Sequence, residues 1–216
     1  MIAKLKVGRL LEEIGQVVRG TAGGSLLYAA GLGAVGAAID LWGTERASNM
    51  PYTLASIIGG YFLLRAMLER QGIIDPDVRQ RLGAYFGLSL LAGLGIVCGF
   101  VLLIVPGVIL FVRWQPAFAI LLAEDRTVSA ALSESWEMTK GQFWPLLAAM
   151  LIVLLVVVLA AAAFAMPDLA PAVPEEVSII LGNTFLSIFS VLSTAFGVAA
   201  YRLLAQPLGE LEEVFA

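Results

Sequence analysis

Apolar residues at helical spacing mark the first stretch of the chain, residues 4–19. Leu10, Leu11, Ile14 and Val17 share one face, and charged or amide side chains occupy the other. This pattern predicts an amphipathic helix. A secretory signal peptide is the alternative for a charged start followed by apolar sequence, but the helix is too long and too regular for one, so we expect it to be retained.

Longer apolar segments without this two-sided pattern make up most of the remaining chain. A bilayer core about 30 Å thick needs roughly 20 helical residues, because each residue of a helix rises about 1.5 Å. Backbone polar groups in hydrocarbon must also be bonded within the segment, which favours helices. We therefore predict six transmembrane helices, at residues 21–39, 51–68, 82–104, 106–122, 143–166 and 177–204.

A second amphipathic helix is predicted at residues 128–140, before Gly141, a residue that commonly follows a helix end. Its apolar face carries Leu132 and Trp136, so we expect it to lie at the cytoplasmic interface of the membrane. Trp136, Lys140 and Trp144 are its candidate interfacial anchors.

The two amphipathic helices are related by a shift of 121 positions, which superposes Leu11 on Leu132 and Gly20 on Gly141. This indicates a parallel internal repeat, each copy a surface helix followed by two spans. Chance similarity between two amphipathic helices is the alternative. The predicted fold class is all-α, a polytopic membrane bundle of six spans and two interfacial helices forming a single domain over residues 1–216.

Charge supports the membrane interpretation and fixes an orientation. Only 14% of the residues are charged, against about 25% in soluble domains, and the mean hydropathy is +0.91. With the N-terminus inside, Arg46 is the one cation in an external loop and Arg113 the one within a span. We expect a multi-pass plasma (inner) membrane protein of a bacterium with both termini cytoplasmic. The net charge of -4 and the scattered cations argue against nucleic acid as a partner.

Prolines define the predicted hairpin in the middle of the chain. Pro106 and Gly107 are expected to form the external turn between the third and fourth spans, and Pro116 is expected to kink the fourth. These are structural predictions.

A longer motif follows this hairpin and resembles a known family. Ile104-Val105-Pro106-Gly107, Arg113 and the run from Ala130 to Trp144 are similar to the membrane domain of bacterial glycerophosphoryl diester phosphodiesterases and to YciC-like inner-membrane proteins. The resemblance implies a helical membrane bundle. In the phosphodiesterases a separate soluble domain supplies catalysis, and this chain contains neither that domain nor any histidine, so we expect no enzymatic activity, no metal site and no cofactor.

Arg113 is the main candidate for a functional site, because an arginine within a span costs roughly 2.5 to 3.5 kcal/mol and needs a partner. Counting from Pro106 places it roughly 10 Å below the external boundary, near the depth of Asn183. The sequence therefore predicts a polar site formed by Arg113, Gln115, Asn183 and Thr184. In the functional alternative, Arg113 binds an anionic lipid headgroup or substrate. In the structural alternative, Arg113 makes an interhelix bond or its side chain snorkels to the interface.

Two functions follow from these features. The first is a non-catalytic membrane protein that organises lipids or partner proteins, with homo-oligomers among the possible assemblies. The second is a small transporter, or a carrier of lipids or anions, with a polar cleft around Arg113. A closed bundle favours the first function, and a polar chamber that reaches one leaflet favours the second.

Overall fold

The computed structural model describes residues 5–42, 50–77, 80–165 and 174–215, and every regular element within them is a helix. The all-α prediction is therefore confirmed for this part of the chain. The helices in chain order are α1 (Val7–Gly20), α2 (Ala22–Trp42), α3 (Met50–Arg70), α4 (Leu82–Leu102), α5 (Ile104–Ala123), α6 (Val128–Met138), α7 (Phe143–Ala165) and α8 (Glu175–Phe215).

Five of these helices, α2, α4, α5, α7 and α8, are long and apolar enough to cross a membrane. The chain is thus a multi-pass membrane protein by its apolar helices. The predicted span at residues 51–68 does form a helix, α3, but it is not among the five. Its last turns carry Arg65, Glu69 and Arg70, which lower its hydropathy. The count of six spans stays a prediction.

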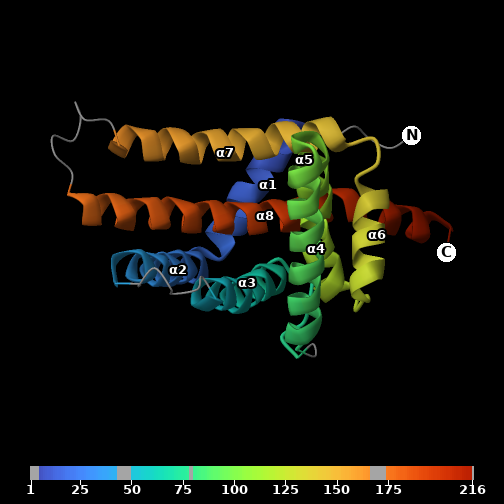
Figure 1. The fold of residues 1–216 in the computed structure, drawn as a ribbon. Helices are drawn as coiled ribbons and strands as arrows, with labels where there is room; N and C mark the ends of the chain where they lie inside the picture. The colour runs from blue at the N-terminus through green and yellow to red at the C-terminus, as the bar shows by residue number, and fades with distance from the viewer. Residues whose placement is uncertain (1–4, 43–49, 78–79, 166–173, 216) are drawn as a thin grey trace.

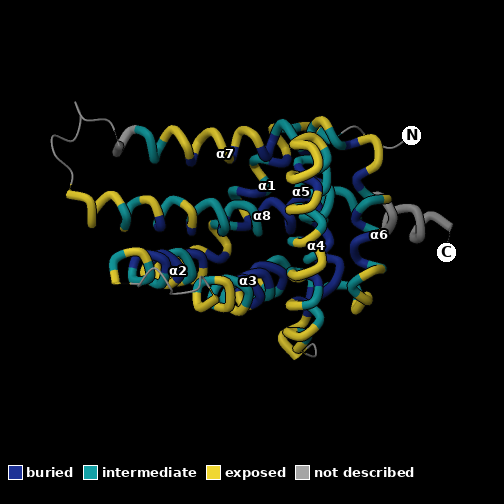
Figure 2. The backbone as a smooth tube through the Cα atoms, viewed as in Figure 1, coloured by how far each residue is buried: buried dark blue, intermediate teal, exposed yellow. Residues whose placement is uncertain are grey.

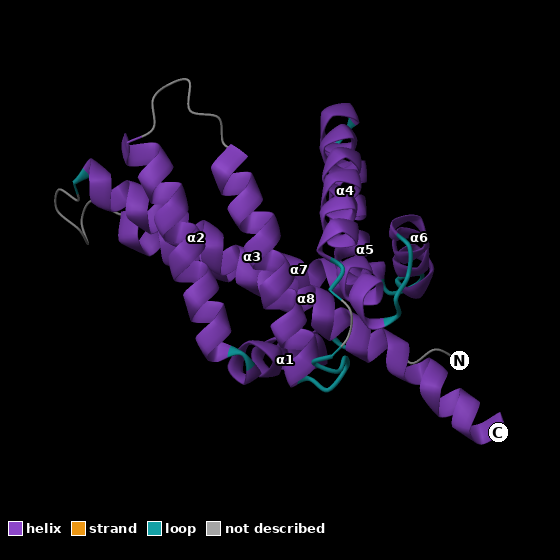
Figure 3. Ribbon diagram, turned by 90° about the horizontal axis from the view of Figure 1, so that it is seen from below, coloured by secondary structure: helices purple, strands orange, loops and turns teal. Residues whose placement is uncertain are grey.

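Two groups of helices cross each other in Figure 1, where α7 and α8 run horizontally and α4 and α6 run vertically. The long helix α8 packs against α1, α2, α3, α5 and α7, and α4 packs along α5. In Figure 3 α6 is seen nearly end-on while α2 and α8 run along their lengths, so α6 lies at a steep angle to both.

The connection between α4 and α5 differs from the predicted turn. The helical backbone is interrupted at Leu103, and Pro106 and Gly107 lie within the first turn of α5. Proline is tolerated there because the first backbone N–H groups of a helix have no intrahelical acceptor. Gly107 instead allows close packing, since a Cβ built on Gly99 of α4 would lie 2.9 Å from the Gly107 Cα.

The amphipathic pattern of α1 is confirmed, but its apolar face packs against protein. Leu10 and Val17 are fully buried and Ile14 nearly so, within contacts to α3, α7 and α8. At the edge of this face, Glu13 pairs with Arg202 of α8. These side chains are covered by protein, and the interfacial placement of α1 stays a prediction.

Helix α6 covers most of the predicted range 128–140 and is stopped as expected. The Thr127 hydroxyl accepts a hydrogen bond from the Ala130 N–H at its start, and Gly141 adopts a left-handed backbone with φ of +75° beyond its end. Its buried face packs on α5 and α4, whereas α1 packs on α8, α7 and α3. The two helices thus have different neighbours, and the internal repeat stays a prediction.

Exposed apolar side chains are concentrated on the surfaces of α4 and α7, as Figure 2 shows for α7. Leu94 and Leu102 of α4 are 64% and 77% exposed, and a continuous apolar face on α7 includes Leu155 and Leu159. A soluble protein rarely exposes such extended apolar surface. Lipid tails would cover it without cost, which supports placement of these helices in a bilayer.

Candidate functional site

Arg113 lies on the face of α5 that packs against α6. Its guanidinium carbon is 4.2 Å from the centre of the Trp136 ring. The Ser135 hydroxyl donates a 2.5 Å hydrogen bond to the Arg113 carbonyl and ties the two helices at this level. Counting residues from Pro106 predicts that Arg113 lies roughly 10 Å below the external boundary, near Asn183. The structure places it beside Trp136 of α6.

The Arg113 side chain has little polar compensation. Its Nε atom is buried without a hydrogen-bond partner, and within the described residues no carboxylate lies within 4.0 Å of the guanidinium. Stacking on an aromatic ring returns about 0.5 to 2 kcal/mol. Placing arginine at bilayer depth costs roughly 2.5 to 3.5 kcal/mol. The stacking therefore leaves part of that cost without a compensating contact.

The predicted partners of Arg113 lie elsewhere. The Asn183 amide of α8 donates to the Asp40 carboxylate of α2 at 2.8 Å and to the Ile179 carbonyl at 3.0 Å, and Thr184 donates to the Ile180 carbonyl. The described structure forms no bond from Arg113 to either residue. The candidate polar site is thus divided, and Asn183 instead joins α2 to α8.

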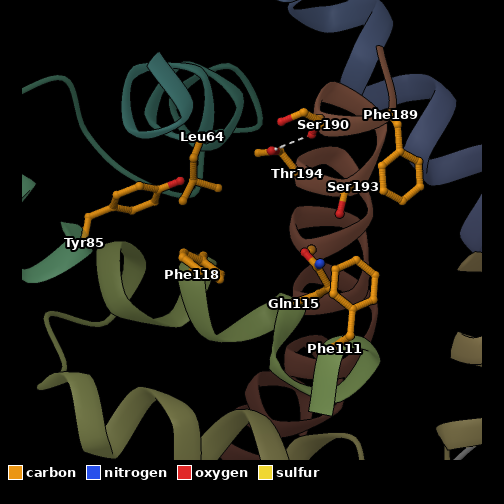
Figure 4. A pocket seen from close by; sticks show the side chains of 10 residues that line it. Leu64, Tyr85, Phe111, Gln115, Phe118, Phe189, Ser190, Ser193 and Thr194 are labelled. Atoms are coloured by element: carbon orange, nitrogen blue, oxygen red, sulfur yellow. Dashed lines mark hydrogen bonds between the residues drawn. The ribbon is translucent and has the colours of Figure 1, made fainter. Parts of the chain in front are cut away.

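Gln115, the remaining member of the predicted site, lines a cavity of about 280 Å³ between α3, α4, α5 and α8 (Figure 4). Apolar and aromatic side chains form most of the wall. The complete lining is Leu64, Tyr85, Phe111, Gln115, Phe118, Phe189, Ser190, Ser193, Thr194 and Gly197.

Polar groups of the cavity divide into bonded and unbonded ones. The Ser190 hydroxyl is bonded to the Tyr28 hydroxyl at 2.9 Å, and the Thr194 hydroxyl donates to the Ser190 carbonyl. The Tyr85 hydroxyl, the Gln115 amide and the Ser193 hydroxyl make no side-chain hydrogen bond to the described residues. Because these atoms are accessible from the cavity, water or a ligand inside it can bond them.

A second cavity of about 200 Å³ lies between α4 and α5. It shares Phe111, Gln115 and Phe118 with the first, so these three side chains separate the two spaces. Its other walls include Ser89 and Trp114.

The connection from α5 to α6 carries a network of charges. Arg126 pairs with Glu124 at 3.4 Å and with Glu134 at 3.0 Å, Arg81 pairs with Asp125 at 3.1 Å, and the Tyr201 hydroxyl donates to Glu124 at 3.1 Å. Burial raises the pKa of Glu124 above its ordinary value, nearby Glu134 raises it further, and the Tyr201 hydrogen bond opposes the change. These carboxylates are engaged in ion pairs that hold the connection together.

The predicted interfacial anchors occupy different environments. Trp136 is partly buried against Arg113 instead of facing lipid. Trp144 is 75% exposed, and Lys140 is exposed and paired with Glu137 at 2.5 Å. Pro116 lies inside α5 as predicted. Its missing N–H deprives the preceding turn of one hydrogen bond.

Sequence reasoning missed the side chains that join Gln115 around the cavity. Ser190, Ser193, Thr194 and Gly197 recur at three- and four-residue spacing, which places them on one face of α8. Small residues four positions apart, such as Ser193 and Gly197, are typical of close helix packing. Gly197 does pack closely, since a Cβ built there would lie 2.7 Å from the Gln115 carbonyl oxygen. The neighbouring hydroxyls were the available signal for a polar cavity.

The chemistry of the cavity is that of neutral hydrogen bonding. Its polar groups are hydroxyls and one amide, which bind alcohols, esters and amides. Among the described residues no group of three histidine, cysteine, aspartate or glutamate side chains is placed to hold a metal ion. The cationic centre, Arg113, lies on the other side of α5, because Gln115 and Phe118 differ from it by about 200° and 140° around the helix.

Comparison with known proteins identifies the family. No curated protein and no solved structure matches the chain. The model of the family described as the membrane domain of glycerophosphoryl diester phosphodiesterase matches residues 90–208, more than half of the 216 residues. The match includes α5, α6, α7 and the α8 wall of the cavity. The chain therefore belongs to the family of membrane domains of glycerophosphoryl diester phosphodiesterase.

Proposed function

We propose that this protein binds a membrane lipid in the cavity between α3, α4, α5 and α8 and has no catalytic role of its own. The observation that supports this proposal is the combination of apolar walls with unpaired polar groups on Tyr85, Gln115 and Ser193. An amphiphile satisfies both requirements, because its hydrocarbon covers the aromatic walls and its ester or hydroxyl oxygens bond the polar groups.

The volume of the cavity limits how much of the lipid it can hold. An apolar cavity of about 150 Å³ in a protein core holds benzene. A volume of about 280 Å³ therefore accommodates a segment of one acyl chain with an adjoining ester or hydroxyl group, while the rest of the lipid stays in the bilayer. The protein would bind part of a lipid laterally instead of enclosing a whole molecule.

Neutral polar groups also favour a lipid-binding role over catalysis. Hydrolysis of a phosphodiester needs a nucleophile, a proton-transfer group and stabilisation of developing charge. The cavity offers hydroxyls and an amide, without a carboxylate or cation in its lining. A lipid bound here would organise the protein in its membrane, consistent with a membrane domain that accompanies catalysis carried out elsewhere.

Native mass spectrometry of the protein released from lipid nanodiscs tests the proposal. Ser193→Leu places a larger apolar side chain in the cavity and removes an unpaired hydroxyl. Ser178→Leu makes the same change at an exposed position of the same helix. Wild type and Ser178→Leu should retain one lipid after activation, and Ser193→Leu should lose it.

Equal retention by the two leucine variants would contradict the proposal, as would a wild-type protein that carries no lipid. Gln115→Leu provides an independent check, because it removes the amide from α5 and leaves α8 unchanged. It should also lower lipid retention.

A further inference from the structure

The guanidinium of Arg113 is a cation whose charge the described protein does not balance. It stacks on Trp136 at 4.2 Å, and its buried Nε has no hydrogen-bond partner. The two carboxylates of α6 are engaged elsewhere, because Glu134 pairs with Arg126 and Glu137 pairs with Lys140. An anion from outside the chain is therefore the natural counter-charge for Arg113.

The chain beyond Trp136 carries side chains that are typical of the membrane boundary. Trp136 lies on the last turns of α6, close to the connection that leads into α7. This connection carries Lys140, and Trp144 follows it with 75% of its surface exposed. Tryptophan and lysine together are typical of the boundary between hydrocarbon and water, where lipid phosphates lie.

We propose that Arg113 and Trp136 form a binding site for a phosphate group, supplied either by a phospholipid headgroup or by free phosphate. The planar guanidinium presents its N–H donors in a fork that fits two phosphate oxygens. The Trp136 ring covers one face of the guanidinium and holds its plane, so the donors at its edge remain directed to the ligand. The hydrogen bond from Ser135 to the Arg113 carbonyl fixes the separation of the two helices.

This site is independent of the proposed lipid cavity. Arg113 lies on the α6 side of α5, whereas Gln115, Phe111 and Phe118 face the cavity. Ser193→Leu should therefore leave phosphate binding unchanged, and Arg113→Gln should leave cavity occupancy unchanged. The two proposals can fail separately.

The test compares ligand-dependent stabilisation of wild type, Arg113→Gln and Arg70→Gln. Arg70 is an exposed arginine at the end of α3, so its substitution controls for general attraction between cations and anions. One arm measures thermal unfolding in nanodiscs of phosphatidylglycerol and in nanodiscs of a phosphate-free galactolipid. The other titrates inorganic phosphate into protein held in a maltoside detergent.

Wild type and Arg70→Gln should be more stable in phosphatidylglycerol than in galactolipid, and Arg113→Gln should lose that difference. Arg113-dependent stabilisation by inorganic phosphate would identify free phosphate as a ligand, with affinity lowered roughly tenfold or more in Arg113→Gln. Arg113→Lys keeps the charge and loses the fork, so it should recover only part of either effect. Equal ligand-dependent stabilisation in wild type and Arg113→Gln in both arms would overturn the proposal, even if the variant were less stable throughout.

Discussion

Replacing Gly197 with alanine tests the close approach of α8 to α5. A Cβ built on Gly197 would lie 2.7 Å from the Gln115 carbonyl oxygen and 3.3 Å from its carbon, both backbone atoms. Ordinary van der Waals contact begins at 3.4 Å, so the two helices must separate by about 0.7 Å, the difference between 3.4 and 2.7 Å. Overpacking of this kind typically costs about 1 to 3 kcal/mol.

Gly182→Ala is the matched control on the same helix, because a Cβ at Gly182 meets nothing within 4 Å. Both variants gain the same helix propensity, about 1 kcal/mol for alanine over glycine. Subtracting one from the other isolates the clash, so Gly197→Ala should be less stable than Gly182→Ala by about 1 to 3 kcal/mol. Reversible unfolding in mixed micelles measures the difference. Equal stabilities, within about 0.5 kcal/mol, would show that α5 and α8 are not packed as described.

Three further predictions address α1 and the charged connection. Leu10→Ala should lower the free energy of unfolding by about 2 to 5 kcal/mol because Leu10 is fully buried, while Leu27→Ala at a 77% exposed position should change it little; equal losses would place α1 outside the core. Arg202→Gln and Glu13→Gln should show a coupling of about 0.5 to 3 kcal/mol in a double-mutant cycle of unfolding, and strict additivity would mean that their ion pair does not hold α1 to α8. Because the pKa of Glu124 is raised, the folded protein holds that proton more tightly than the unfolded chain and loses stability as pH rises through the folded pKa. The melting temperature of Glu124→Gln minus that of wild type should therefore increase from acidic to neutral buffer. A difference that stays constant with pH, or that decreases, would contradict the raised pKa.

The sequence was sufficient to predict the helices because their signals are local. The apolar segments, the stop at Gly141 and the amphipathic face of α1 all follow from spacing within one stretch of chain. Pro106 and Gly107 were misplaced by a few residues, since a proline suits the first turn of a helix as well as the turn before it.

The candidate site was harder to predict, because it depends on how distant helices cross. Residue counting assumes that spans run parallel, and on that assumption Arg113 and Asn183 have similar depths. In the structure Arg113 stacks on Trp136 of α6, and Asn183 bonds Asp40 of α2. Gln115 was selected from the sequence, but its neighbours Tyr85 and Ser193 come from two other helices. No periodicity within α5 indicates which faces of those helices it meets.

Photolabelling with a phospholipid that carries a diazirine on one acyl chain close to the ester tests the lipid-binding cavity most directly. After irradiation in nanodiscs, mass spectrometry of the peptides locates the labelled side chains. In wild type we expect labels at Phe111, Phe118 and Phe189. In Ser193→Leu these labels should be lost, while labels at exposed positions such as Leu155 should remain. Labels confined to exposed positions, or cavity labels that survive in Ser193→Leu, would contradict it.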